Sequence, residues 1–245
     1  MSLTKREYEL LETIVAFGGY VTRGMVETYN PDITIRWANK ILLSLAETRY
    51  IKCVGGFGKT QQNIYQVTFK TCKLFGQPHS HMRKKHGSTT IRRNLVRAHF
   101  LFQNIEPKDY LEVSSSEKRI KYLQSLGVDN MLIPRKINNG QEILQIEEPF
   151  LLLPPFAPDD GICVVLVDMI ESDPSRQLRM MIDRYVPLIR SKVIPLSFLI
   201  VVEDTDRSDE YKDLYEKQIL KKDPSKPKMN VFSIETTYNF CSKQV

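Results

Sequence analysis

The stretch that decides the fold is Pro158–Tyr185, PDDGICVVLVDMIESDPSRQLRMMIDRY. Its residues 162–167 predict a buried strand, because a short apolar run rich in β-branched residues lies between a glycine and an acid. Asp173 and Pro174 then predict the start of a helix that runs to about Tyr185, with Asp173 as its N-cap. Together with a second buried strand at 195–202 and an edge strand at 231–234, this order predicts an α+β chain whose C-terminal part is built on a mixed sheet.

Acidic residues stand on both sides of the predicted strand. Asp159 precedes it, Asp168 ends it, and Glu171 follows closely. Carboxylate oxygens are the ligands that Mg²⁺ and Mn²⁺ prefer, so the sequence predicts a metal held by Asp159 and Asp168, with Glu171 as a third catalytic acid. Such a metal would activate water or stabilise the transition state of phosphodiester cleavage. The alternative is an ordinary strand whose acids are solvated turn residues.

Composition excludes several classes of protein. The 245 residues, 42% hydrophobic and 26% charged, are typical of a globular protein with one large domain or two small ones. No apolar run reaches membrane-spanning length, and the N-terminus has no apolar signal region, so we expect a cytoplasmic protein without a membrane partner. The four cysteines lie far apart with no paired spacing, so neither a zinc knuckle nor a disulfide framework is indicated. A net charge of +6 permits nucleic-acid binding without requiring it.

Residues 1–76 predict a winged helix-turn-helix domain. Thr4 and Glu7 form a capping-box pattern before the first helix, and Thr34 is placed to cap the third, IRWANKILLSLAET. A glycine-rich turn then separates two predicted strands, 50–54 and 63–67. Three helices followed by a hairpin are the element order of this DNA-binding domain.

In such a domain the third helix enters the major groove of double-stranded DNA. Its face opposite the core would present Arg36, Asn39 and Lys40. The wing would bring Lys59, Gln61 and Gln62 to a phosphate or to the minor groove. The alternative is a winged helix that makes only protein contacts.

A basic linker is predicted at 77–88. It contains Arg83, Lys84 and Lys85, which we expect to contact DNA phosphates, and the histidines His79, His81 and His86. A zinc site at the histidines and a merely solvated linker remain alternatives. The second domain is predicted to span 89–245, beginning with a helix at 89–102. Strands at 131–133 and 142–146 are expected to pair beside the central strand.

The second domain resembles the PD-(D/E)xK, or restriction-endonuclease-like, nucleases. Pro158-Asp159 matches the first half of their signature and Asp168 the acid of the second half, whereas Ile170 stands where the signature has lysine. Glu171 or Lys192 are candidates to replace that lysine. With the predicted winged helix, the whole order is similar to the replication-relaxation proteins of mobile elements and to MobC-type plasmid relaxases. That resemblance rests on Val67-Thr68, Pro158-Asp159, Val167-Asp168, Tyr185 and Arg207.

The resemblance implies a plasmid mobilisation relaxase that nicks origin DNA with Mg²⁺ or Mn²⁺, acting beside other mobilisation or replication proteins. Tyr185 is interpreted as a packing or positioning residue. The alternative is a catalytically inactive accessory protein, or a winged-helix regulator of transcription or replication. Three converging acidic oxygens near a cation would favour the enzyme, and two splayed acids would favour the accessory protein.

Overall fold

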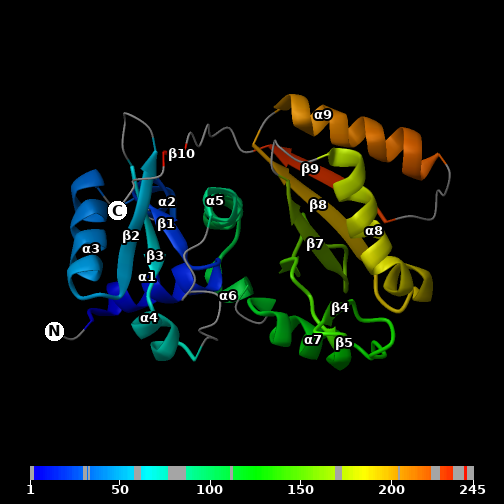
Figure 1. The fold of residues 1–245 in the computed structure, drawn as a ribbon, viewed down its shortest axis with the longest axis horizontal. Coiled ribbons are helices and arrows are strands. Elements are labelled where there is room, and N and C mark those ends of the chain that lie inside the picture. The colour runs from blue at the N-terminus through cyan, green and yellow to red at the C-terminus, as the bar shows by residue number, and fades with distance from the viewer. Residues whose placement is uncertain are drawn as a thin grey trace. The chain divides into compact units, whose positions relative to one another are not determined.

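The computed structural model describes residues 3–29, 32, 34–57, 62–76, 87–110, 113–168, 173–203, 205–221, 227–233 and 240–241. The chain mixes helices and strands and divides into two compact units (Figure 1). Unit 1 comprises Met1–Pro107 and Thr237–Val245, and unit 2 comprises Lys108–Thr236. No helix in the described ranges is long and apolar enough to cross a membrane.

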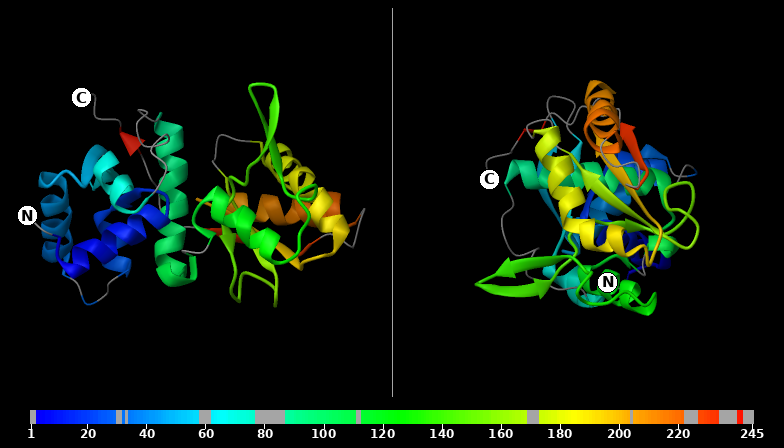
Figure 2. Two further views of the ribbon diagram at one scale, coloured as in Figure 1. Left: turned by 90° about the horizontal axis from the view of Figure 1, so that it is seen from below. Right: turned by 90° about the vertical axis from the view of Figure 1, so that its right-hand side faces the viewer.

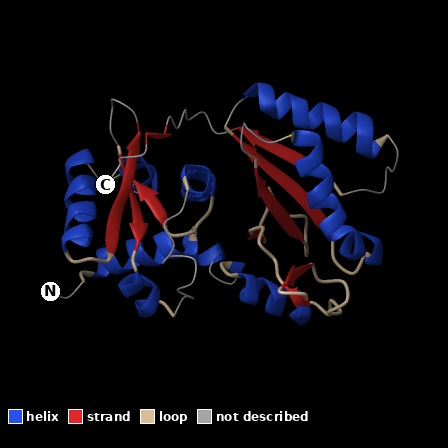
Figure 3. Cartoon of the chain, in the orientation of Figure 1, coloured by secondary structure: helices blue, strands red, loops and turns tan. Residues whose placement is uncertain are grey.

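Unit 1 combines helices with one antiparallel sheet of strand order β1-β3-β2-β10. Its elements are α1 (Lys5–Ala16), β1 (Tyr20–Thr22), α2 (Arg23–Tyr29), α3 (Ile35–Glu47), β2 (Ile51–Phe57), β3 (Asn63–Val67), α4 (Phe69–Leu74), α5 (Ser88–Asn104) and β10 (Phe240–Cys241). The predicted helices and hairpin of the N-terminal region are therefore present, and Figure 3 shows how they alternate with the strands.

Side-chain caps fix the starts of two of these helices. The Thr4 hydroxyl accepts a hydrogen bond from the Glu7 backbone N–H, and the Glu7 carboxylate accepts one from the Thr4 N–H at 2.8 Å, which completes the predicted capping box. Thr34 caps α3 in the same way, through the Trp37 N–H. These bonds satisfy backbone donors that the first helical turn leaves without a partner.

Helix α5 belongs to unit 1, which corrects the predicted domain boundary. The sequence assigned this helix to a second domain starting at residue 89, but it packs on β1 and α2. The Phe102 ring meets Phe17 edge-on at 5.1 Å and Tyr29 at 5.7 Å. β10 also returns to unit 1 and pairs with β2, so the second domain does not run to the C-terminus. The packing of α5 on β1 and α2, and the pairing of β10 with β2, join residues far apart in sequence. The local spacing of apolar residues does not predict such contacts.

Unit 2 is built on a mixed four-stranded sheet of order β6-β7-β8-β9. Strands β7, β8 and β9 are parallel, and β6 pairs antiparallel with β7. The elements are α6 (Pro107–Tyr110), α7 (Ser116–Ser125), β4 (Arg135–Asn138), β5 (Gln141–Leu144), β6 (Phe150–Leu151), β7 (Ile162–Val167), α8 (Pro174–Ser191), β8 (Leu196–Val202), α9 (Thr205–Leu214), the π-helical turn η2 (Tyr215–Leu220) and β9 (Met229–Ser233).

One face of this sheet is covered by α8 and α9, which contact each other (Figure 2). From α8, the Tyr185 ring lies 6.2 Å from Phe198 of β8 and 6.5 Å from Phe150 of β6. Strands β7 and β8 are almost wholly buried, as their continuous apolar sequences predict. Helix α8 starts at the predicted cap Asp173 but continues past Tyr185 to Ser191, because Leu188, beyond the internal Pro187, is fully buried.

The prediction that strands at 131–133 and 142–146 pair beside the central strand was wrong. Residues 131–133 form a turn, because the Asp129 carboxylate accepts a hydrogen bond from the Met131 N–H at 2.7 Å and its carbonyl accepts one from the Leu132 N–H. The strands are β4 and β5, which pair with each other in a separate, exposed hairpin. The strand that pairs with β7 on the side away from β8 is the short β6.

Burial of His99 in α5 generates a prediction on the pH dependence of stability. Its side chain is 8% exposed, and this burial lowers the pKa of His99 to about 4. In the unfolded chain the imidazole takes up a proton near pH 6.5. The unfolded state therefore binds more protons between these two values. The contribution of His99 to stability is complete above pH 6.5 and is lost as the pH falls toward 4.

We expect His99→Phe to flatten the fall in the free energy of unfolding between pH 6.5 and 4, by an amount on the order of 2 to 3 kcal/mol. Urea unfolding of both proteins across this range measures the difference. Subtracting the two curves removes the effect of the other histidines. Parallel curves for wild type and variant would contradict a buried neutral imidazole.

Candidate nucleic-acid interface

Helix α3 divides into a buried and an exposed face. Its inner residues are each at most 6% exposed, and they pack toward α2 and β2. These residues are Ala38, Ile41, Leu42 and Leu45. On the other side the structure places Arg36, Asn39 and Lys40, all three exposed, where the sequence predicted them. A helix with an apolar core face and a basic outer face has the form required of an element that enters a DNA groove.

Helix α1 is hydrogen-bonded to the C-terminal half of α3 and places a cation beside its first turn. The Ser44 hydroxyl donates a hydrogen bond of 2.9 Å to the Glu7 carboxylate. Burial opposes ionisation of Glu7, but hydrogen bonds from Thr4 and Ser44 hold its pKa below the usual value. The Arg6 guanidinium lies 5.8 Å from the centre of the Trp37 ring. The exposed Arg6 therefore extends the basic surface next to α3.

Charge is divided unequally between the two units. Unit 1 contains seventeen Lys and Arg against seven Asp and Glu, a net charge of +10. Unit 2 contains eighteen against twenty-two, a net charge of −4, and the two values together give the +6 of the whole chain. The moderate total thus conceals one basic and one acidic unit. A polyanion is attracted to unit 1 and repelled by unit 2.

The wing prediction is altered at one described residue. The side-chain amide oxygen Oε1 of Gln62 accepts a hydrogen bond from the Gly24 backbone N–H at 3.3 Å, so this side chain is engaged at the start of α2. Lys59, Gln61, Arg83, Lys84, Lys85, His79, His81 and His86 lie outside the described residues.

The structure does not bring Asp159 and Asp168 together. Asp159 is exposed in a turn before β7, and Asp168 is 2% exposed just after β7 ends. Six extended residues separate the two ends, a span of about 20 Å. Ligands of one cation must place their oxygens within about 2.6 Å of it, so these two carboxylates cannot share a metal. A strand keeps acids at its opposite ends apart, so the described residues give no support to a metal held by this pair.

The turn that carries Asp159 has a structural explanation. Asp160 has a positive φ of 53°, and the Gly161 N–H donates to the Pro158 carbonyl. A Cβ on Gly161 would approach the Pro195 carbonyl oxygen to 2.4 Å, so only glycine allows β7 to start against β8 here. The Pro-Asp-Asp-Gly sequence therefore makes a tight turn into the sheet.

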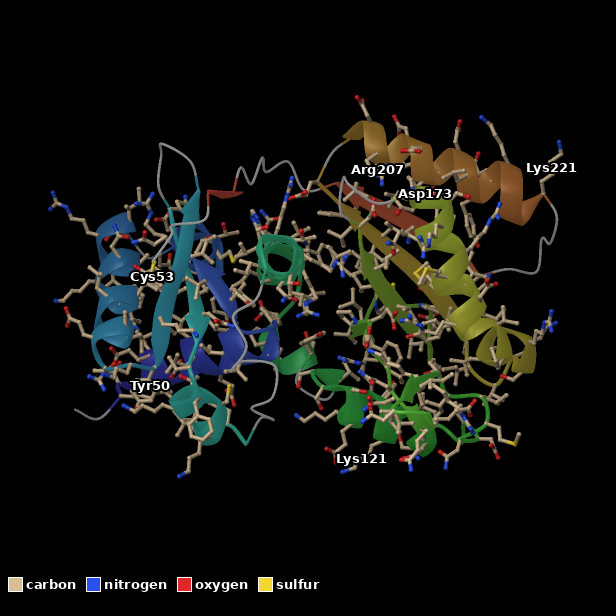
Figure 4. The ribbon with its side chains drawn as sticks, viewed as in Figure 1. Tyr50, Cys53, Lys121, Asp173, Arg207 and Lys221 are labelled. Carbon is tan, nitrogen blue, oxygen red and sulfur yellow. The ribbon has the colours of Figure 1, made fainter. Side chains whose placement is uncertain are left out.

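Asp168 forms a buried ion pair with Arg207 of α9. The Nε of Arg207, labelled in Figure 4, donates to the Asp168 carboxylate at 2.8 Å. Partial burial opposes the charge on Arg207, but the hydrogen bond and the negative charge of Asp168 raise its pKa above the usual value. Burial, and then the charge of Asp168, raise the pKa of Tyr211 on the same helix. The acid at the end of β7 is thus neutralised by a cation of the protein.

No metal cluster forms within the parts of the chain that the structure describes: no group of three or more His, Cys, Asp or Glu side chains is placed to hold an ion there. Glu171 lies outside those parts. Mg²⁺ or Mn²⁺ at Asp159 and Asp168 therefore does not fit the geometry, and we derive no catalytic step through a metal.

The sequence reasoning missed a second buried polar cluster, centred on Glu148. The Tyr185 hydroxyl donates to the Glu148 carboxylate at 3.1 Å, and Arg184 forms an ion pair with the same group. Tyr185 is fully buried, and burial followed by the charge of Glu148 raises its pKa well above the usual value. A buried, protonated phenol is suited to packing and unsuited to nucleophilic attack. The adjacent acids Glu147 and Glu148 before β6 were the sequence signal that could have indicated this cluster.

Comparison with known proteins found no matching family model, no matching curated protein and no matching solved structure.

The Asp168–Arg207 pair generates a prediction on stability. Arg207→Met leaves a buried carboxylate without its cationic partner, and we expect a loss of about 3 kcal/mol in the free energy of unfolding. Asp168→Asn should also destabilise the protein, and the double variant should lose less than the sum of the two, by 1 kcal/mol or more on the usual scale of coupled pairs. Urea unfolding of the four proteins measures this coupling.

The exposed pair Lys212–Asp209, on the same helix as Arg207, is the matched control. Its coupling energy should stay below about 1 kcal/mol, because solvent screens it. Additive effects at Asp168 and Arg207 would contradict the ion pair. A rise in melting temperature with Mn²⁺ that Asp168→Asn abolishes would show that Asp168 binds metal after all.

Proposed function

We propose that the chain is a DNA-binding protein in which unit 1 is a winged helix-turn-helix domain and α3 enters the major groove of double-stranded DNA. The order α1, β1, α2, α3, β2, β3 supports this assignment, as does the antiparallel sheet formed by the three strands. The observation that carries the proposal is the exposed basic face of α3 within a unit of net charge +10.

The same observations favour DNA over a purely protein partner. Release of counterions from phosphates by Lys and Arg supplies most of the sequence-independent affinity for DNA. Arg36 and Lys40 lie one helical turn apart on the exposed face, so both can reach the same groove. The positive N-terminal end of the α3 dipole adds to the attraction for phosphate.

For unit 2 we propose an accessory role in place of nicking. The resemblance to plasmid relaxases with a restriction-endonuclease-like domain suggests that the protein serves a mobile element in the cytoplasm, beside other mobilisation or replication proteins. Two splayed acids, one exposed and one paired with Arg207, favour a catalytically inactive member of such a group or a regulator. Nicking of supercoiled plasmid with Mn²⁺ that is lost in Asp168→Asn would instead support the relaxase.

The test removes the cations of α3. Arg36→Ala with Lys40→Ala should weaken binding to duplex DNA and lower the slope of log K against log salt concentration by about 2, since each lost phosphate contact lowers it by about 1. Fluorescence anisotropy with a labelled duplex at several salt concentrations measures both quantities.

The control is Arg176→Ala with Arg190→Ala, two exposed arginines of α8 in the acidic unit. This variant has the same net charge as the α3 variant. It should bind DNA like wild type apart from a small uniform change. Equal loss of affinity and slope in both variants would contradict α3 as the contact.

A further inference from the structure

The exposed face of α3 contains two large apolar side chains in addition to its cations. Ile35 is 56% exposed and Leu43 is 53% exposed. With Asn39 between them they form a row at positions i, i+4 and i+8, which places them along one line of the helix surface. Arg36 and Lys40 form the neighbouring row. Exposed aliphatic residues are common singly, but here two of them flank an exposed amide on the surface of one helix.

Each residue type in this row has a defined partner in the major groove. An asparagine amide forms two hydrogen bonds with the N6 and N7 atoms of adenine, and aliphatic side chains contact the C5 methyl of thymine. Adenine and thymine are the two members of one base pair. A row of aliphatic, amide and aliphatic side chains therefore complements A·T pairs and offers nothing to the amino group of cytosine, for which an acid is suited.

The distribution of charge along α3 determines which end of this row would lie closest to DNA. The cations Arg36 and Lys40 lie in its N-terminal half, whereas the exposed Glu47 ends it. Phosphates are attracted to the first half and repelled near the last turn, so Ile35 and Asn39 lie where the helix approaches DNA most closely. Leu43 lies one turn further, about 6 Å along the axis from Asn39.

We propose that α3 recognises a duplex site containing A·T pairs, with Asn39 hydrogen-bonded to an adenine and Leu43 and Ile35 in contact with thymine methyl groups. This inference rests on the proposed function, because it requires α3 to lie in the major groove. It assigns specificity to the uncharged row and affinity to Arg36 and Lys40. The two rows thereby perform separable tasks.

The experiment first selects duplexes that bind the full-length protein from a random pool, and then replaces each thymine of the selected site by uracil, which lacks only the methyl group. We expect the selected site to contain A·T pairs. Uracil at a contacted position should weaken wild-type binding roughly fourfold, the value of one buried methyl. Leu43→Ala and Ile35→Ala should each lose the uracil effect at one thymine, the one that the removed side chain contacts, and keep it at the other. Asn39→Ala should reduce the preference for A·T at one position roughly tenfold or more.

Leu74→Ala is the matched control, since Leu74 is 43% exposed on α4 of the same unit. This variant should remain as sensitive to uracil as wild type. Absence of any duplex binding would refute the proposed function itself. Duplex binding without base preference, a selected site of G·C pairs alone, or uracil sensitivity that persists at every thymine in both Leu43→Ala and Ile35→Ala would overturn this inference and leave the proposed function standing. Preference for an acidic polypeptide over duplex DNA would overturn both.

Discussion

Burial of the inner face of α3 is the constraint on which the account of unit 1 depends. Four apolar side chains of this helix have almost no exposed surface, and their burial contributes on the order of several kcal/mol. Rotating the helix to hide its outer face would expose them. Arg36, Asn39 and Lys40 are therefore held facing outward, and the cap at Thr34 and the Glu7–Ser44 hydrogen bond add to the cost of rotating the helix. The exposed face is fixed by the core beneath it.

In unit 1, α3 presents its predicted contact residues on one face, whereas in unit 2 the extended strand β7 keeps two predicted site residues apart. It holds Asp159 and Asp168 at its two ends, in different surroundings. Asp159 serves a turn that brings Gly161 against Pro195, and Asp168 is paired with Arg207. Acids that look clustered in sequence are thus separated by the one element that the sequence predicts best. Unit 2, with its net negative charge, is poorly suited to approach phosphates by itself.

Short sequence patterns correctly predicted the helix caps and the buried strands, because these depend on residues close together in the chain. The caps at Thr4, Thr34 and Asp173 are all formed, and the apolar runs became β7 and β8. Contacts between distant residues were not predictable in this way. The association of α5 with unit 1 depends on rings meeting across the core. The Asp168–Arg207 and Glu148–Tyr185 pairs join residues 39 and 37 positions apart. For the candidate site, the sequence pointed to the cations and Asn39, which the structure places at the surface, but not to the exposed Ile35 and Leu43, because only polar and charged residues were considered as DNA contacts.

The central claim is that DNA meets the protein at the outer face of α3. Amide hydrogen exchange of the full chain, with and without a short duplex at low salt, tests it most directly, because the exchange rates report on each segment separately. The account predicts slower exchange over the first turns of α3 and at the N-terminus of α1, with α8 and α9 unchanged. Protection confined to unit 2, with α3 unaffected by the duplex, would contradict it.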